Sequence, residues 1–80
     1  MTVLAVFKSR AQALDCISTL KKEGVPARPV ANPPEARVGC GISARFEDTF
    51  LPRVRRIVSK KSYSAFAGYM KSAGSSYFYF

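Results

Sequence analysis

The stretch from residue 40 to residue 61, CGISARFEDTFLPRVRRIVSKK, decides the fold. In its first part the apolar residues Ile42 and Phe46 alternate with the polar residues Ser43 and Arg45. Alternation with a period of two is typical of a strand that buries one face. We therefore predict a strand from residue 42 to residue 46, with Ser43 and Arg45 pointing away from the core.

The second part of the stretch predicts an amphipathic helix that ends near Lys60. Asp48 or Thr49 can cap its N-terminus, and Pro52 then falls in the first turn, where a missing N–H is tolerated. Apolar residues repeat at helical spacing, at Phe50, Leu51, Val54, Ile57 and Val58.

The residues before this stretch predict a strand, a helix and a second short strand. Residues 2–7 are almost continuously apolar, as in a central strand. Ser9 and Gln12 form a capping-box pattern, and the helix that they begin ends at Gly24. Residues 27–31 are restricted by their prolines to an edge strand.

The residues after the stretch complete the pattern with a strand over residues 63–70. The composition of residues 71–76, KSAGSS, predicts a flexible linker. The order β-α-β-β-α-β predicts an α+β, ferredoxin-like sandwich with a four-stranded antiparallel sheet and two helices on one face. We expect a single domain over residues 1–71, then a linker and aromatic tail over residues 72–80.

Composition limits the function classes. The 80 residues include thirteen Lys or Arg against five Asp or Glu, a net charge of +8 that favours anionic partners. There is no histidine and no phosphate-binding glycine loop, so we expect no metal, no cofactor, no catalytic residue and no enzyme activity. No apolar run is long enough to cross a membrane, and the N-terminus does not resemble a signal peptide. We expect a cytoplasmic protein.

Cys40 is the first candidate for chemistry, because it lies between Gly39 and Gly41. Glycines leave a thiol with little steric cover, and their N–H groups can stabilise an anionic sulfur. Arg37 and Arg45 are close in sequence and could lower the pKa of the thiol. The alternative is a small apolar residue at a tight strand entry, and the residues themselves leave both interpretations open.

Several motifs together resemble a known family. These are the strand that ends at Phe7, the helix of residues 11–23 with the turn Gly24-Val25-Pro26, the pair Pro33-Pro34, and the strand of residues 40–46 that opens with Cys-Gly. Over residues 3–60 the chain resembles the selenium/sulfur carrier-like proteins, which are short bacterial domains. The resemblance implies that Cys40 accepts sulfur or selenium from a donor protein and passes it to an acceptor protein.

Two further groups of residues are candidate interaction sites. The basic group is a solvated helix face or a docking surface for nucleic acid or an acidic protein. The aromatic group at the C-terminus suits strand addition to a sheet edge, as a contact between copies or as cover within the domain; a disordered end is the third alternative. The basic residues are Arg53, Arg55, Arg56, Lys60 and Lys61, and the aromatic residues are Tyr77, Phe78, Tyr79 and Phe80.

Overall fold

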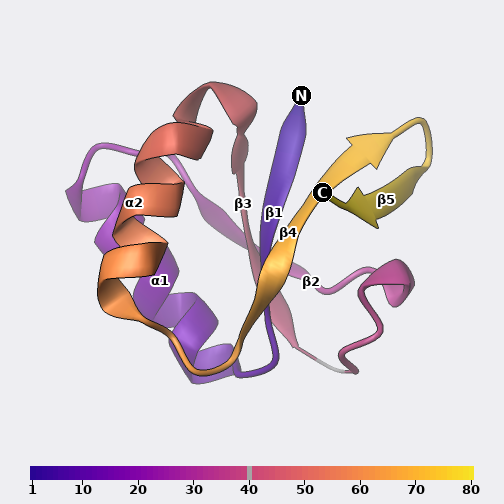
Figure 1. The fold of residues 1–80 in the computed structure, drawn as a ribbon, viewed down its shortest axis with the longest axis horizontal. Helices are drawn as coiled ribbons and strands as arrows, with labels where there is room; N and C mark the ends of the chain where they lie inside the picture. The colour runs from indigo at the N-terminus through magenta and orange to yellow at the C-terminus, as the bar shows by residue number, and fades with distance from the viewer. Residues whose placement is uncertain (40) are drawn as a thin grey trace.

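The computed structural model describes residues 1–39 and 41–80 (Figure 1). Within these residues the fold has five strands and two helices, together with two short 3-10 turns, η1 and η2. The elements are β1 (Thr2–Phe7), α1 (Arg10–Lys22), β2 (Arg28–Ala31), η1 (Pro34–Ala36), β3 (Ile42–Glu47), η2 (Asp48–Phe50), α2 (Leu51–Lys61), β4 (Phe66–Ala73) and β5 (Ser76–Tyr79).

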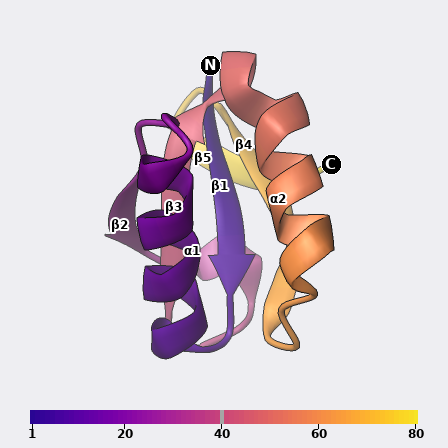
Figure 2. The same ribbon diagram turned by 90° about the vertical axis from the view of Figure 1, so that its left-hand side faces the viewer.

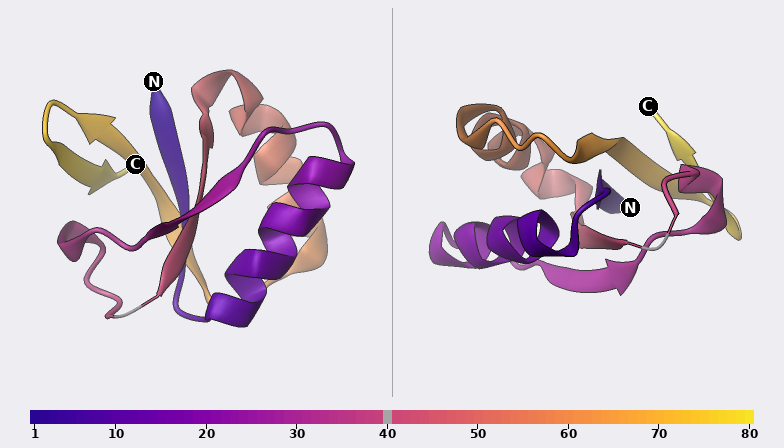
Figure 3. Two further views of the ribbon diagram at one scale, coloured as in Figure 1. Left: turned by 180° about the vertical axis from the view of Figure 1, so that it is seen from behind. Right: turned by 90° about the horizontal axis from the view of Figure 1, so that it is seen from below.

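The strands form one antiparallel sheet in the order β2-β3-β1-β4-β5, which confirms the α+β class. The sheet has five strands, where the sequence predicted four. β1 is central, and its continuous apolar run fits this place because both of its faces are covered. Both helices lie on one face of the sheet, side by side (Figures 2 and 3).

The main core lies between the sheet and the helices. Phe7 is fully buried there, and Ala13, Cys16 and Leu20 meet it from α1. Ser9 caps α1 as predicted, since its Oγ accepts a hydrogen bond from the Gln12 N–H at 3.2 Å. The predicted cap of α2 is wrong: no side chain caps this helix, which instead follows directly on η2.

A second, smaller core lies on the other face of the sheet. Leu4, Val6 and Met70 are buried against Ala36 of η1. η1 and β5 lie on this side, away from the helices (Figure 3). The prediction that Ser43 points to solvent is therefore wrong. This side chain is fully buried, because Ser43 lies between Val6 and Val30 in the sheet, on the face that carries the second core.

The C-terminal residues continue the sheet. β4 extends to Ala73, Gly74 turns with a φ of +62°, and β5 pairs with β4 in register from Met70 opposite Tyr79 to Ala73 opposite Ser76. Composition predicted a flexible linker here. Pairing with β4 and burial of Tyr77 against the second core outweigh the weak strand preference of glycine and serine. Among the described residues, no helix is long and apolar enough to cross a membrane.

Candidate functional site around the Gly39–Gly41 turn

Cys40, the predicted carrier thiol, lies outside the described residues, and its neighbours define the site. Gly39 is exposed and has a φ of +74°, in the left-handed region that favours glycine. Arg37 ends η1, also in the left-handed conformation, and is exposed. A Cβ placed on Gly39 would meet no atom within 4 Å, so the glycine here serves the backbone conformation and not close packing.

Gly41 has no room for a side chain. A Cβ placed on it would lie 2.5 Å from the Asn32 Nδ2 and 2.7 Å from the Phe7 carbonyl oxygen. The second contact is to backbone of the buried central strand, which cannot move aside cheaply. The glycine is therefore required here by packing, whereas at Gly39 it is required by conformation.

A polar network holds Gly41 in place. The Asn32 Nδ2 donates to the Phe7 carbonyl oxygen at 2.9 Å, and the Ser43 hydroxyl donates to the Asn32 Oδ1 at 2.5 Å. The Asn32 N–H donates to the Gly41 carbonyl oxygen at 3.1 Å. Asn32 thus ties together the end of β1 and the start of β3, directly after β2. The sequence analysis did not identify Asn32. The available signal was Ser43, a polar residue in an apolar strand, because a buried hydroxyl needs a hydrogen-bond partner.

A hollow of about 260 Å³ adjoins Gly41. Arg10, at the first position of α1, lines it together with Gly41 and residues 29–31 and 42. The N-terminus of a helix carries partial positive charge, and the arginine adds a full one. The end of β1, the start of α1 and the start of β3 lie at the same end of the sheet (Figure 1). Arg10 is a cation close to Gly41, although the two residues are far apart in the sequence.

Arg45, the other predicted support for the thiol, lies further along β3. It pairs with Leu4 on one side and Arg28 on the other. It lies three positions after Ile42, which corresponds to about 10 Å along a strand.

Cys16 lacks the solvent exposure and the low pKa that are typical of a reactive thiol. Its side chain is fully buried in the main core. Burial, together with the nearby Asp15 carboxylate, raises the pKa of the Cys16 thiol to about 11. At neutral pH this cysteine is a protonated core residue.

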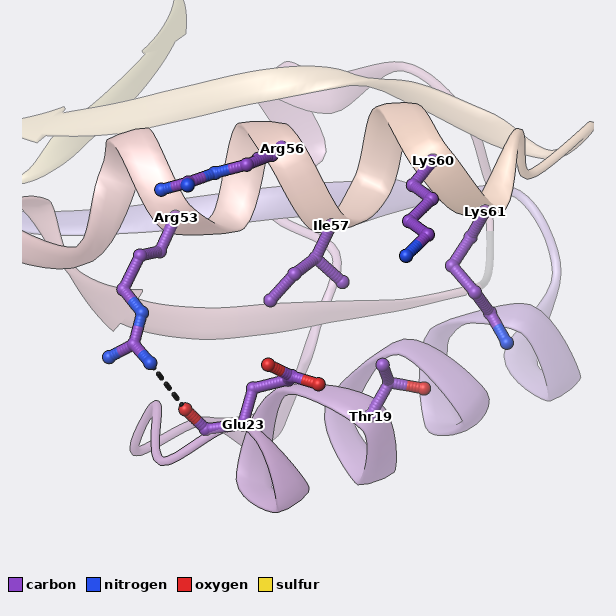
Figure 4. Close-up of a pocket in the computed structure, with 7 residues that line it drawn as sticks. All are labelled: Thr19, Glu23, Arg53, Arg56, Ile57, Lys60 and Lys61. Carbon is purple, nitrogen blue, oxygen red and sulfur yellow. Dashed lines mark hydrogen bonds between the residues drawn. The ribbon is translucent and has the colours of Figure 1, made fainter.

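Four of the five predicted basic docking residues line one groove between α1 and α2 (Figure 4). The groove encloses about 410 Å³. Its lining residues are Thr19, Glu23, Arg53, Arg56, Ile57, Lys60 and Lys61.

These cations differ in how firmly they are held. Arg53 donates to the Glu23 carbonyl oxygen at 2.8 Å, and Lys61 lies 3.2 Å from the Asp15 carboxylate. Within residues 1–39 and 41–80, Arg56 and Lys60 make no ion pair. The fifth residue, Arg55, lies outside the groove.

The described residues contain no group of three His, Cys, Asp or Glu side chains able to hold a metal ion. What the described residues offer instead is Gly41 beside the N-terminus of α1, and a cationic groove.

Comparison with known families identifies the class of protein. The family model described as "Putative Se/S carrier protein-like" matches residues 2–69, and the chain belongs to this family. The match spans β1 through the first half of β4 and includes residues 39–41, whereas β5 lies beyond it. A search of curated proteins and a search of solved structures each found no match.

Proposed function

We propose that this protein is a carrier that accepts sulfur or selenium on Cys40 and passes it to a second protein. The observation that carries the proposal is the family match over residues 2–69, which spans Cys40 and both of its glycines. The chain acts in this role as a carrier, without a catalytic residue or cofactor of its own.

The transfer step needs no external oxidant. The Cys40 thiolate attacks the outer sulfur of a persulfide on the donor protein. The donor S–S bond breaks, the donor thiolate leaves, and a new S–S bond forms on Cys40. The same step from a selenium-bearing donor breaks and forms an S–Se bond. The acceptor then repeats the attack on the carrier.

The surroundings of the turn support a reactive thiol at this position. Thiolates are favoured near helix N-termini and cations. The first residue of α1, Arg10, lines the hollow beside Gly41, and Arg37 precedes the turn. The other cysteine, Cys16, is buried and protonated at neutral pH, which leaves Cys40 as the sulfur to carry cargo.

The groove between α1 and α2 supports docking of an acidic donor or acceptor protein. Arg53, Arg56 and Lys60 follow one another along α2 at spacings of three and four residues, which places them on one face. An acidic helix with carboxylates at the same spacing would complement them. Docking by charge selects the partner and speeds encounter more than it adds affinity.

For the architecture we propose the ferredoxin-like arrangement for β1 through β4, with β5 added at the edge. The antiparallel sheet with both helices on one face supports it.

Alkylation under native conditions tests the proposal. We expect iodoacetamide to modify Cys40 rapidly at pH 8 and Cys16 only after unfolding, because the reactive species is an accessible thiolate. The variants Cys40→Ser and Cys16→Ser, followed by peptide mapping, assign each rate. Equal rates for the two cysteines in the folded protein would count against the carrier role.

A further inference from the structure

The four aromatic residues at the C-terminus divide into two pairs with different roles. Tyr77 packs against the second core, and the Tyr79 hydroxyl donates to the Ala36 carbonyl oxygen at 2.7 Å. Side chains alternate along a strand, so Phe78 and Phe80 lie on the other side, where they are 43% and 45% exposed. Tyr79 is 41% exposed as well, but its hydroxyl and ring are engaged by Ala36 and Gly68, whereas among the described residues Phe78 and Phe80 make no such contact with η1.

Cations accompany the exposed rings. The Lys71 ammonium lies 5.5 Å from the centre of the Phe78 ring and 4.9 Å from that of Phe80. The Arg55 guanidinium lies 5.8 Å from the Phe80 ring and 5.0 Å from the Tyr69 ring. We call Arg55, Lys71, Phe78 and Phe80 the aromatic–cation surface.

The aromatic–cation surface borders a hollow between α2 and β4. The hollow encloses about 420 Å³ and is lined by Arg55 and Ser59 on α2 and by Tyr63, Phe66 and Tyr69. Aromatic rings and positive charges are therefore found both at the edge strand β5 and in the adjoining hollow.

We propose that the aromatic–cation surface binds single-stranded nucleic acid. Bases stack on Phe78 and Phe80, and Lys71 and Arg55 contact the phosphates. Exposed rings interleaved with cations are the features that bind single strands without sequence preference. The net charge of +8 adds attraction over the whole molecule.

Two observations favour this ligand over others. An acidic peptide would pair with Lys71 and Arg55 but would leave the exposed rings without a role. The open sheet face on which many proteins of mixed α and β structure stack RNA bases is closed here, because η1 and β5 cover it. Bases must therefore bind at the sheet edge. Lys71, Phe78 and Phe80 lie beyond residue 69, outside the family match, whereas Arg55 lies within it. The surface includes neither Cys40 nor its flanking glycines, so it is distinct from the proposed carrier site.

Fluorescence anisotropy with the full chain tests the proposal. The probe is a labelled single-stranded oligouridine of about twelve nucleotides, titrated over a series of salt concentrations. We expect Phe78→Leu and Phe80→Leu each to weaken binding about fivefold or more with an unchanged salt slope, because a ring is lost and no charge is. Phe78→Tyr keeps the ring and should bind like the parent.

Charge-matched variants complete the test. Lys71→Gln should lower the slope of log K against log salt by about 0.7, the value for one phosphate contact on a single strand. Lys22→Gln removes the same charge from an exposed position on α1 and should leave binding within about twofold of the parent. Cys40→Ser should bind like the parent, which separates this result from the carrier proposal.

Four results would overturn the proposal. They are no binding at low salt, parental affinity in both leucine variants, equal effects of Lys71→Gln and Lys22→Gln, and equal affinity for a duplex of the same length. Self-association through the edge of β5, seen as a doubled solution mass that Phe78→Leu abolishes, would also overturn it by assigning the rings to a second copy.

Discussion

Asn32 shows at the scale of one residue how the turn before β3 is positioned. Its side chain bridges the Phe7 carbonyl group and the buried Ser43 hydroxyl, and its N–H bonds to Gly41. Removal of this side chain would leave the Phe7 carbonyl group and the Ser43 hydroxyl without this partner, whereas the backbone bond to Gly41 would remain. A buried polar group without a partner is costly, so a single amide holds together the ends of three strands.

We predict that Asn32→Ala lowers the free energy of unfolding by about 2 kcal/mol, because Ser43 and the Phe7 carbonyl lose their partners. Asn32→Asp should cost at least as much, since it places an acceptor against that carbonyl. Denaturant unfolding followed by circular dichroism measures both. Ser18→Ala, at an exposed position on α1, is the control. If Asn32→Ala were as stable as this control, the network would not support the turn.

Cys16 makes stability depend on alkaline pH. In the unfolded chain the thiol ionises near its ordinary pKa of 9.0, and in the folded chain near 11. Between these values the unfolded chain has lost a proton that the folded chain keeps, so stability falls as pH rises. Below the lower value the contribution is fully present.

We therefore expect the stability advantage of the parent over Cys16→Ala to shrink between about pH 9 and pH 11, by about 2 to 3 kcal/mol. The free energy of unfolding of both proteins is measured at several pH values. The lysines titrate in both proteins, so their contribution cancels in the difference between the two. A difference that stayed constant over this range would show that burial does not shift the thiol.

At the scale of elements, the β4–β5 hairpin and η1 support each other. The Tyr79 hydroxyl bonds to Ala36, and the Tyr77 N–H donates to the Glu35 carboxylate at 3.2 Å. The Tyr79 ring also lies against Gly68, where a Cβ would approach it to 3.2 Å. The hairpin thereby fixes the loop that leads to Gly39.

We predict that Tyr79→Phe lowers the free energy of unfolding by about 1 kcal/mol, the typical net value of one hydrogen bond. It should also speed hydrogen exchange at the Arg37 N–H, which bonds to Pro34 in η1. Exchange followed by NMR measures this local effect. Phe78→Leu, at an exposed position, should change neither quantity; equal exchange rates in parent and Tyr79→Phe would mean that the hairpin does not hold η1.

The contrast between β3 and β5 shows what the sequence could predict. The alternation of residues 42–46 and the cap at Ser9 are local patterns, and both predicted elements are present. β5 depends on pairing with β4, and Ser43 is buried on the face of the sheet where separate segments of the chain form the second core. Neither has a local signal. The same holds for the site: Gly39 and Gly41 could be identified, whereas Asn32 and Arg10 come close to Gly41 only through folding.

At the scale of the whole molecule, the candidate sites lie in three separate places. The Gly39–Gly41 turn lies where β3 begins, and Arg10 supplies a positive helix end beside it. The cationic groove follows the two helices, and the aromatic–cation surface lies at the β5 edge of the sheet. In the roles that we propose, this basic chain of 80 residues carries cargo at one site and binds partners at separate surfaces.

Intact mass spectrometry tests the central claim most directly. The protein is incubated with a persulfide donor and analysed without reductant. We predict a mass gain of one sulfur atom that thiol reductant removes, that Cys16→Ser retains and that Cys40→Ser abolishes. A parent protein that gains no sulfur, or a Cys40→Ser variant that gains as much as the parent, would contradict the carrier role.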